Sequence, residues 1–459
     1  MYKEDTIAAI STPHGTGGVG IIRISGGDAF RIAGNIFFGK KQFNSIKSHT
    51  INYGKIIDTK NDLVLDEVLI SKMEKPNTFT REDVVEINCH GGIVVLKKVL
   101  ELCLEEGARI AEPGEFTKRA FLNGRIDLSQ AEAVIDLINS KTDQSAKAAI
   151  SQMEGVFSKK LKEARDKLIK VLSHIEVNID YPEYDIEEIS ERMIQDELVG
   201  IKNDLNNIIS GFERGRIIRE GLDAAIIGRP NVGKSSLLNN LVGKERAIVT
   251  DIPGTTRDII EEYINLEGIP VRIIDTAGVR KTEDAVEKIG LEKTQNAIDE
   301  ADLVIMMVDA QRGLNEDDHT MISQLLGKRL IILINKIDLV DEYEILKMEK
   351  KLEGKKILRI SLKKEVGVDK LGHVIAQLFA LGKINMKNEI LLTNIRHRNL
   401  LGKSILSIDN ALNAQNQGMP VEFIAMDIKE AADYLGQITG ESVSEDIIHE
   451  IFSRFCLGK

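Results

Sequence analysis

The stretch that decides the fold lies at residues 228–235 and reads GRPNVGKS. It matches the pattern G-x-x-x-x-G-K-[ST], whose glycines let backbone N–H groups curl around a phosphate. The apolar run 224–227 predicts a strand before it, and residues 236–241 predict a helix after it. This order predicts a phosphate-binding loop, in which Lys234 reaches the β and γ oxygens and Ser235 offers a hydroxyl to Mg²⁺. An accidental glycine-rich turn is the alternative, and the flanking strand and helix argue against it.

Further apolar runs follow this loop, with helical segments between most of them. They lie at 271–274, 303–308, 330–334 and 357–360. Strands that alternate with helices predict a doubly wound, mostly parallel sheet. We expect this α/β domain to cover residues 216–382.

Two motifs follow strands of this domain. Residues 275–278 read DTAG, which would place a carboxylate near the metal and a glycine N–H near the γ-phosphate. Residues 335–338 read NKID, and the Asp338 carboxylate can accept from the ring N–H and the exocyclic amine of guanine. Adenine offers an acceptor at the first position and lacks the amine, so we expect a guanine nucleotide. Ser361 would supply a backbone contact to the base.

Residues 250–258, TDIPGTTRD, predict a switch loop in which Thr256 completes the Mg²⁺ coordination. The start of a solvated hairpin is the alternative. Val279 stands where Ras-like enzymes place the glutamine that orients water, and an apolar side chain cannot do that. Glu287 is the nearest candidate for this task, against the alternative of an exposed helix glutamate. We assign to the nucleotide Asn231, Val232, Gly233, Lys234, Ser235, Ser236, Thr250, Asp251, Ile252, Pro253, Gly254, Thr255, Thr256, Asp275, Thr276, Ala277, Gly278, Asn335, Lys336, Asp338 and Ser361.

The charge of the chain limits how it can bind nucleic acid. Its 459 residues carry 61 Lys and Arg against 72 Asp and Glu, a formal net charge of −11. This balance argues against a chain-wide electrostatic grip on nucleic acid, so any RNA contact must be local. Aromatic residues make up 4% and Trp is absent, which leaves few platforms for stacked bases.

The cysteines Cys89, Cys103 and Cys456 are too few and too scattered for a disulfide framework, which favours a reducing compartment. No cysteine or histidine cluster has zinc-site spacing. The first five residues carry charge, and no apolar run approaches the roughly 18 residues of a membrane span. We expect a soluble, cytoplasmic protein without membrane insertion.

The rest of the chain surrounds the α/β domain. Residues 1–120 predict a compact α+β domain, with strands at 6–11, 20–24, 51–57, 67–73 and 84–88 and a helix at 93–105 that Gly107 closes. Ser129 and Glu132 have capping-box spacing, and an apolar stripe from Ile150 to Ile175 predicts one long helix that stops near Pro182.

Residues 185–209 and 388–455 also have helical patterns. A C-terminal segment of this length needs a partner surface for its apolar faces. We therefore expect the segments 121–215 and 383–459 to pack together as one helical domain, with the α/β domain inserted between them.

With GTTRD at 254–258 and the ending FCLGK at 455–459, these motifs resemble the bacterial tRNA-modification GTPases of the MnmE family, also called TrmE. The resemblance covers essentially the whole chain. It implies an N-terminal folate-binding and dimer-forming domain, a split helical domain and an inserted Ras-like GTPase domain. Leu457 stands where the family usually has Ile, a swap of little physical consequence.

The resemblance further implies hydrolysis of GTP that K⁺ stimulates. The ion would be held by Asn231, Thr250, Ile252 and Thr255, and would neutralise charge that develops on the β/γ oxygens. The water-positioning glutamate of the family matches Glu287.

The resemblance also implies a folate, 5-formyl- or 5,10-methylene-tetrahydrofolate, as the donor of a one-carbon unit. The matching positions are Arg23, Glu82, Arg125 and Lys459. Basic groups suit the glutamate carboxylates of the folate, and a carboxylate suits its pterin donors. The residues alone would allow ordinary surface charges here. Cys456 matches the tail cysteine associated with the modification step, and an incidental cysteine is the alternative.

The function that the resemblance implies is modification of C5 of the wobble uridine of certain tRNAs with a carboxymethylaminomethyl or aminomethyl group. A homodimer would act with an FAD-dependent partner of the MnmG or GidA type, in a heterotetramer or larger complex, and a more basic partner would supply much of the phosphate contact. Two alternatives stay open. The chain could be a regulatory switch in ribosome assembly, or its N-terminal domain could serve dimerisation alone.

Overall fold

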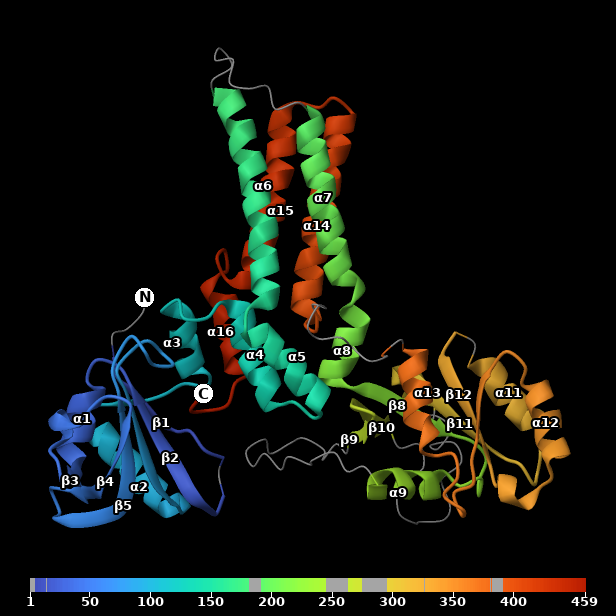
Figure 1. The fold of residues 1–459 in the computed structure, drawn as a ribbon, viewed down its shortest axis with the longest axis horizontal. Helices are drawn as coiled ribbons and strands as arrows, with labels where there is room; N and C mark the ends of the chain where they lie inside the picture. The colour runs from blue at the N-terminus through green and yellow to red at the C-terminus, as the bar shows by residue number, and fades with distance from the viewer. Residues whose placement is uncertain are drawn as a thin grey trace.

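The computed structural model describes residues 5–13, 15–180, 191–244, 263–274, 295–325, 327–379, 381 and 391–459. Figure 1 shows a sheet-and-helix unit at the N-terminus, a tall bundle of helices, and a second sheet-and-helix unit made by the middle of the chain, called the inserted unit below. The expected combination of an α+β domain, a helical domain and an α/β domain is confirmed.

The N-terminal unit is built on a sheet with the strand order β3-β4-β5-β6-β2-β1-β7. Its strands are β1 (Ile7–Ile10), β2 (Gly17–Ser25), β3 (Phe37–Gly39), β4 (Thr50–Asp58), β5 (Leu63–Met73), β6 (Val84–Gly91) and β7 (Arg109–Ile110). Helices α1 (Ala29–Ile36) and α2 (Ile93–Glu105) close a core with alternate residues of the central strands, such as Ile70 and Ile87. A 3₁₀ turn, η1 (Phe43–Ser45), and helix α3 (Glu115–Leu122) complete this unit.

All the strands expected in this unit are confirmed, and the helix expected at 93–105 has those bounds. Helices α1 and α3 and strands β3 and β7 were not expected from the sequence, because elements of eight residues or fewer show no clear period.

The inserted unit has the strand order β13-β12-β11-β8-β10-β9. Its strands are β8 (Leu222–Ile227), β9 (Tyr263–Leu266), β10 (Ile269–Ile274), β11 (Leu303–Asp309), β12 (Arg329–Asn335) and β13 (Lys356–Arg359). The pairs are parallel except for β9 with β10, which confirms the doubly wound sheet. Every residue of β11 is buried, as expected for a strand covered on both faces.

Helices cover both faces of this sheet (Figure 1). They are α9 (Lys234–Lys244), α11 (Glu316–Gln324), α12 (Glu342–Lys351) and α13 (Lys370–Leu378), with a 3₁₀ turn η2 (Ile337–Leu339). Helix α8 (Phe212–Glu220) leads into the unit and contributes to two cores, since Phe212 joins the bundle and Ile217 joins the inserted unit. The domain limit drawn at 215/216 lies inside this helix, and the drawn limits stay predictions.

The bundle joins two stretches that the inserted unit separates in the sequence. The long helices α6 (Val156–Asp180) and α7 (Glu191–Ser210) share one core with α14 (Ile395–Asn416) and α15 (Val421–Thr439). Figure 1 shows α4 (Leu128–Ile138) and α5 (Asp143–Met153) at the foot of the bundle, with α16 (Glu445–Ser453) beside α4. The expected packing of these two stretches is confirmed.

Two local expectations at the foot of the bundle are wrong. The capping box of α4 pairs Asp127 with Gln130, because the side chains of Ser129 and Glu132 are buried and bond elsewhere. The expected single helix through Ile150 is two helices, because Gly155 adopts φ +79° and turns the chain between α5 and α6. Ile150 is consequently 44% exposed, whereas the stripe from Phe157 to Ile175 is buried as expected.

The C-terminal residues 454–459, called the tail, lie against the N-terminal unit. Ser11 Oγ donates to the Gly458 carbonyl at 3.1 Å, and the Gly114 N–H donates to the Cys456 carbonyl at 3.3 Å. Gly458 has φ +84°, and a Cβ there would lie 2.3 Å from the Ile10 carbonyl oxygen, so only glycine fits. Among the helices that the structure describes, none is long and apolar enough to cross a membrane.

Candidate functional site

The loop between β8 and α9 has the backbone shape that the glycine-rich motif predicts. Gly228 and Gly233 have φ +139° and +111°, and Asn231 has φ +65°. A Cβ at Gly228 would lie 2.4 Å from the Met307 carbonyl oxygen, and one at Gly233 would lie 2.5 Å from Asn335 Nδ2. Both glycines are therefore required where the loop passes under the ends of β11 and β12.

Lys234 folds back over this loop. Its Nζ donates to the carbonyls of Gly228 at 2.6 Å and Arg229 at 2.9 Å, and burial lowers the pKa of Lys234. The exposed residues Ser235 and Ser236 follow in the first turn of α9. The free N–H groups and the positive dipole end of this helix face the loop, an arrangement suited to a phosphate anion.

The NKID segment holds the loop from the other side. Asn335 Nδ2 donates to the Val232 carbonyl at 2.8 Å, and Asn335 Oδ1 accepts from the Leu362 N–H at 3.3 Å. Lys336, with φ +65°, donates through Nζ to the Asn231 carbonyl at 3.1 Å and to Asp309 Oδ2 at 2.6 Å. The segments 228–235 and 335–338 thus form one rigid cradle, although the residues that these hydrogen bonds join are 103 and 105 positions apart in the sequence.

Asp338 lies at the mouth of this cradle. Its Oδ1 accepts from Ser361 Oγ at 2.6 Å, and this hydrogen bond lowers the pKa of Asp338. The exposed carboxylate is therefore charged at neutral pH and can accept from a base. Ser361 orients that carboxylate through its side chain, a role beyond the expected backbone contact.

Residues that the sequence analysis missed fix the loop from behind. Arg229 Nη2 donates to the Gly313 carbonyl at 2.7 Å and pairs at 2.9 Å with Asp318, which is fully buried in the first turn of α11. Asp309, which is 1% exposed, forms an ion pair with Lys336. Asn315 with Asp318 three residues on has the spacing of a capping box, but this signal predicts only the helix start.

Several predicted positions lie outside the described residues. They are Thr250, Asp251, Ile252, Pro253, Gly254, Thr255, Thr256, Asp275, Thr276, Ala277, Gly278 and Glu287. Their assignments to GTP, Mg²⁺, K⁺ and the attacking water stay predictions.

Two of the residues assigned to folate, Arg23 and Lys459, lie where the tail meets the N-terminal unit. We call Arg23, Glu82, Arg125 and Lys459, with the rings of Phe79 and Phe116, the tail cluster. Arg23 pairs with Glu86 at 2.8 Å, donates to the Gly458 carbonyl at 3.4 Å, and lies 5.6 Å from the centre of the Phe116 ring. The Phe116 N–H donates to the Lys459 carbonyl at 3.2 Å. Arg23 and the tail are thus in direct contact.

Glu82 and Arg125 lie on the neighbouring segments. Glu82 accepts from Ser25 Oγ at 2.6 Å and from Arg119 Nη1 at 3.2 Å. Arg125 lies 4.9 Å from the centre of the Phe79 ring, and its burial and the nearby Arg81 lower the pKa of Arg125. Phe79 and Phe116 pack in one apolar cluster with residues of β1, and this cluster contacts Arg23, Arg125 and the Lys459 backbone.

The three cysteines differ in exposure. Cys456 is exposed in the tail, whereas Cys89 and Cys103 are buried in the N-terminal core. Burial raises the pKa of Cys89 to about 12 and raises that of Cys103 as well. Cys456 is therefore the thiol open to reagents, and the other two are inert.

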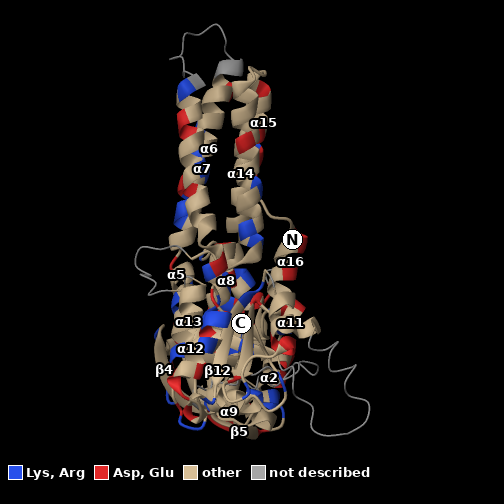
Figure 2. Cartoon of the chain, turned by 90° about the vertical axis from the view of Figure 1, so that its right-hand side faces the viewer, with Lys and Arg blue, Asp and Glu red and all other residues tan. Residues whose placement is uncertain are grey.

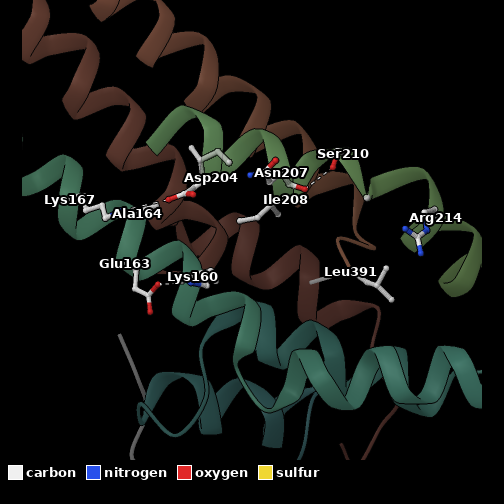
Figure 3. A pocket seen from close by; sticks show the side chains of 12 residues that line it. Lys160, Glu163, Ala164, Lys167, Asp204, Asn207, Ile208, Ser210, Arg214 and Leu391 are labelled. Carbon is white, nitrogen blue, oxygen red and sulfur yellow. Dashed lines mark hydrogen bonds and ion pairs between the residues drawn. The ribbon is translucent and has the colours of Figure 1, made fainter. Parts of the chain in front are cut away.

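A further hollow of about 360 Å³ lies between α6 and α7, and Figure 3 shows the side chains around it. Its charged groups pair with one another, as in Lys160 with Glu163 at 3.1 Å and Lys167 with Asp204 at 3.7 Å. Figure 2 shows the same mixture of basic and acidic residues along the bundle helices. This mixture gives the hollow no clear preference for an anion or a cation.

Comparison with known proteins covers both ends of the chain. The family model described as the MnmE helical domain matches residues 128–456, and the model described as the GTP-binding protein TrmE N-terminus matches residues 6–125. A tRNA modification GTPase MnmE of Acetivibrio thermocellus is 69% identical over 459 residues, with 100% of both chains covered. The protein of the same name in Bacillus subtilis is 48% identical, with 99% of this chain and 100% of that one covered.

Among solved structures, Era of Aquifex aeolicus bound to GDP and AlF₄⁻ is 27% identical, with 40% of this chain and 66% of that chain covered and a TM-score of 0.29. The family models and the relatives of full length agree with the motifs at 228–235 and 335–338. The chain belongs to the MnmE (TrmE) family of tRNA modification GTPases, and it is a GTP hydrolase that acts in tRNA modification.

Proposed function

We propose that the cradle formed by residues 228–235 and 335–338 binds GTP and that K⁺ stimulates its hydrolysis. The observation that carries this proposal is a pair of hydrogen bonds between the two motifs. Asn335 donates to the Val232 carbonyl, and Lys336 donates to the Asn231 carbonyl. Ser235 would be a ligand of Mg²⁺ at the start of α9, with Thr256 as the second protein ligand.

The exposed side chain of Asn231 supports a cation site beside the phosphate loop. Its backbone carbonyl is engaged by Lys336 at 3.1 Å, which leaves the side-chain amide oxygen as the available donor to an ion. Amide and carbonyl oxygens suit a hard cation, and Thr250, Ile252 and Thr255 would complete the set. A cation there neutralises charge on the β/γ oxygens as the bond to the γ-phosphate breaks. Glu287 would orient the water.

The cation proposal is tested by measuring GTP turnover in KCl and in NaCl. Turnover is expected to be higher in KCl, and Asn231→Ala is expected to lose that difference. Asn239→Ala, an exposed asparagine of α9, should keep it. Equal rates in the two salts for the unchanged protein would overturn the cation mechanism.

We further propose that the tail cluster binds 5-formyl- or 5,10-methylene-tetrahydrofolate. Arg23, Arg125 and Lys459 supply positive charge for the glutamate carboxylates, and Glu82 accepts from the pterin. The aromatic rings beneath Arg23 and Arg125 give an apolar floor next to these charges. Isothermal titration with the folate should give heat that Arg23→Ala weakens, while Arg31→Ala, 51% exposed on α1, should not. Absence of heat would favour a dimerisation module without folate.

In this proposal the one-carbon unit passes to C5 of the wobble uridine of certain tRNAs, in the cytoplasm, together with an FAD-dependent partner of the MnmG type. Cys456 is exposed in the tail, three residues before Lys459, and would approach the substrate from there. The mixed charges of Figure 2 support a division of labour in which a more basic partner contacts much of the tRNA backbone. Mass spectrometry of wobble nucleosides from cells without this protein should show uridine lacking the group. Intact modification would favour a regulatory switch.

We also propose a homodimer through the outer face of the N-terminal sheet. Ile51, Tyr53 and Leu69 point away from α1 and α2 and are 68%, 61% and 46% exposed, and Tyr53 lies opposite Leu69 in register. An exposed apolar stripe of this kind is typical of an interface. Sedimentation should show a dimer that Leu69→Lys dissociates, whereas Leu346→Lys on α12, at a similar exposure of 51%, leaves it intact. A dimer that survives Leu69→Lys would place the interface elsewhere.

A further inference from the structure

Helix α4 carries two carboxylates one turn apart, and each contacts a helix that flanks the inserted unit in the sequence. Glu132, 6% exposed, accepts from Asn394 Nδ2 at 3.0 Å, Arg396 Nη2 at 2.7 Å and His397 Nε2 at 2.6 Å. These partners lie at the start of α14, in the described stretch that follows the inserted unit. Burial opposes the charge of Glu132, but His397 and Arg396 lower its pKa to about 2, so the carboxylate stays ionised.

Asp136 holds the segment that leads into the inserted unit. It accepts from Arg219 Nε at 2.8 Å, in the last turn of α8. One turn earlier on α8, Arg216 donates to Asp302 at 2.8 Å, and Asp302 directly precedes β11 of the inserted unit. Helix α8 therefore has one arginine on α4 and another on the inserted unit.

The two connecting segments also touch each other. A Cβ at Gly215 of α8 would lie 2.1 Å from the Leu392 carbonyl oxygen, so the two backbones are in contact. A further contact runs from Gln144 Nε2 of α5 to the Glu267 carbonyl of the β9–β10 turn at 3.2 Å. A displacement of the inserted unit must therefore exert a force on α4 and its neighbour α5 through these contacts.

The opposite end of α4 contacts the tail. Leu128 and Ala131 form one apolar cluster with Phe452 and Phe455, the residue before Cys456. Figure 1 shows α4 beside α16 and near the C-terminus. The 11 residues of α4 span about 16 Å, and a helix of this length moves as a stiff rod. Arg125 of the tail cluster precedes it by three residues.

We infer that α4 transmits displacements of the inserted unit to the tail. Asp136 with Arg219, and Glu132 with its partners Asn394, Arg396 and His397, act as positioning residues. Packed interfaces tend to have discrete arrangements, so a small shift at one end of a rod can select between arrangements at the other. The ion pairs couple the ends because removing one partner leaves the other charge uncompensated, in a buried place at Glu132 and in a partly buried one between Asp136 and Arg219.

The test uses the thiol of Cys456 as a reporter in the full chain. Because Cys89 and Cys103 are buried, alkylation by iodoacetamide reports the tail alone. The rate is measured with GDP and with GDP plus aluminium fluoride, which mimics the transferring phosphoryl group. This readout requires no chemical role of Cys456, so failure of the proposed modification chemistry would leave the test intact.

The two nucleotide states should differ in alkylation rate by about threefold or more in the unchanged protein, the range of ordinary coupling between sites. Arg219→Gln and Asp136→Asn should each bring the ratio closer to one, because the Glu132 contacts remain, and the double variant should lose nothing further, as expected for two members of one pair. GTP turnover of each variant, measured alongside, shows that the inserted unit is intact.

Arg165→Gln is the matched control. Arg165 of α6 pairs with Glu441 at 2.7 Å and is 24% exposed, close to the 26% of Arg219. Glu441 lies between α15 and α16, so this variant also probes a route to the tail that avoids α4. A ratio lost in Arg165→Gln but kept in Arg219→Gln and Asp136→Asn would overturn the inference. A ratio of one in the unchanged protein would overturn it too.

Discussion

The phosphate loop and the tail cluster are built in opposite ways. The loop is one continuous run, 228–235, between a strand and the helix that follows it directly. The tail cluster joins Arg23 of β2, Glu82 before β6, Arg125 before α4 and Lys459 at the end of the chain. One site is local in sequence, and the other exists only when the whole chain has folded.

This difference determines what each site can tolerate. The loop depends on backbone geometry at Gly228 and Gly233, which its own strand and helix impose. The tail cluster depends on remote contacts, such as Arg23 with the Gly458 carbonyl. Changes far from the inserted unit should therefore disturb the tail cluster and spare the loop.

The largest effect is expected for Lys234→Ala, which removes the positive charge of the local site. We expect kcat for GTP hydrolysis to fall about 10²- to 10³-fold, as for loss of one group that stabilises the transition state. Lys347→Ala, an exposed lysine of α12, should leave steady-state hydrolysis unchanged. A folate affinity that falls as far as kcat would show that the two sites are not separate.

Asp338→Asn should change the base that the cradle prefers. The amide can no longer accept from both guanine donors, so GTP affinity should fall about 10²-fold, the cost of unpaired polar groups. Xanthine carries a carbonyl where guanine has the amine, and the new NH₂ can donate to it. Competition binding with labelled nucleotides measures both. Ser361→Ala removes the hydrogen bond to Asp338 and the one from the Lys364 N–H but keeps the carboxylate, so it should have a smaller effect. An unaltered preference in Asp338→Asn would remove that residue from the base site.

Deleting residues 456–459 should break the assembled site alone. Folate affinity should fall about tenfold, because Arg23 and Phe116 lose hydrogen-bond acceptors and Lys459 is removed. GTP turnover should not change, since the hydrogen bonds described here for the tail go to the N-terminal unit and none goes to a described residue of the inserted unit. Titration calorimetry and a phosphate-release assay on the same preparation measure both. Loss of GTP turnover would show that the local site depends on the tail.

Lowering the pH should give the smallest effect. It should weaken the ion pairs of Asp5 and Glu115 with Arg109 and Arg119, and Arg119 in turn contacts Glu82 of the tail cluster. Hydrogen bonding from Arg109 lowers the pKa of Asp5, and although burial opposes it, hydrogen bonds from Arg109 and Arg119 lower the pKa of Glu115. Because the folded-state pKa values lie below the unfolded ones, this stability is present above about pH 4.5 and is lost as pH falls through the folded values. Denaturant unfolding at pH 5 and pH 3.5 should show that the free energy of unfolding falls less between these pH values in Glu115→Gln than in the unchanged protein. Equal losses would mean that Glu115 does not contribute.

Much of the fold follows from patterns in the sequence. Most strands of both sheets, though not β3, β7 or β9, and the helix at 93–105 follow from apolar patterns in the sequence. The packing of α6 and α7 with α14 and α15 follows from unpaired apolar faces. The break at Gly155 was missed because the apolar spacing continues across it, and the period alone does not show where a glycine turns the chain. The capping box was misplaced because Asp127 and Ser129 both suit an N-cap, and burial of Ser129 decided between them.

The sequence by itself determined the phosphate loop and the NKID motif, because their chemistry depends on residues within one turn or strand end. Only the tertiary structure decided that Arg229 is anchored by Asp318, that Arg23 meets the tail, and that Glu132 and Asp136 of α4 pair with residues of α14 and α8. Those contacts join residues that are 83 or more positions apart, where no spacing rule operates. Each arises because a charge removed from water must find its partner wherever the packing of the core places it.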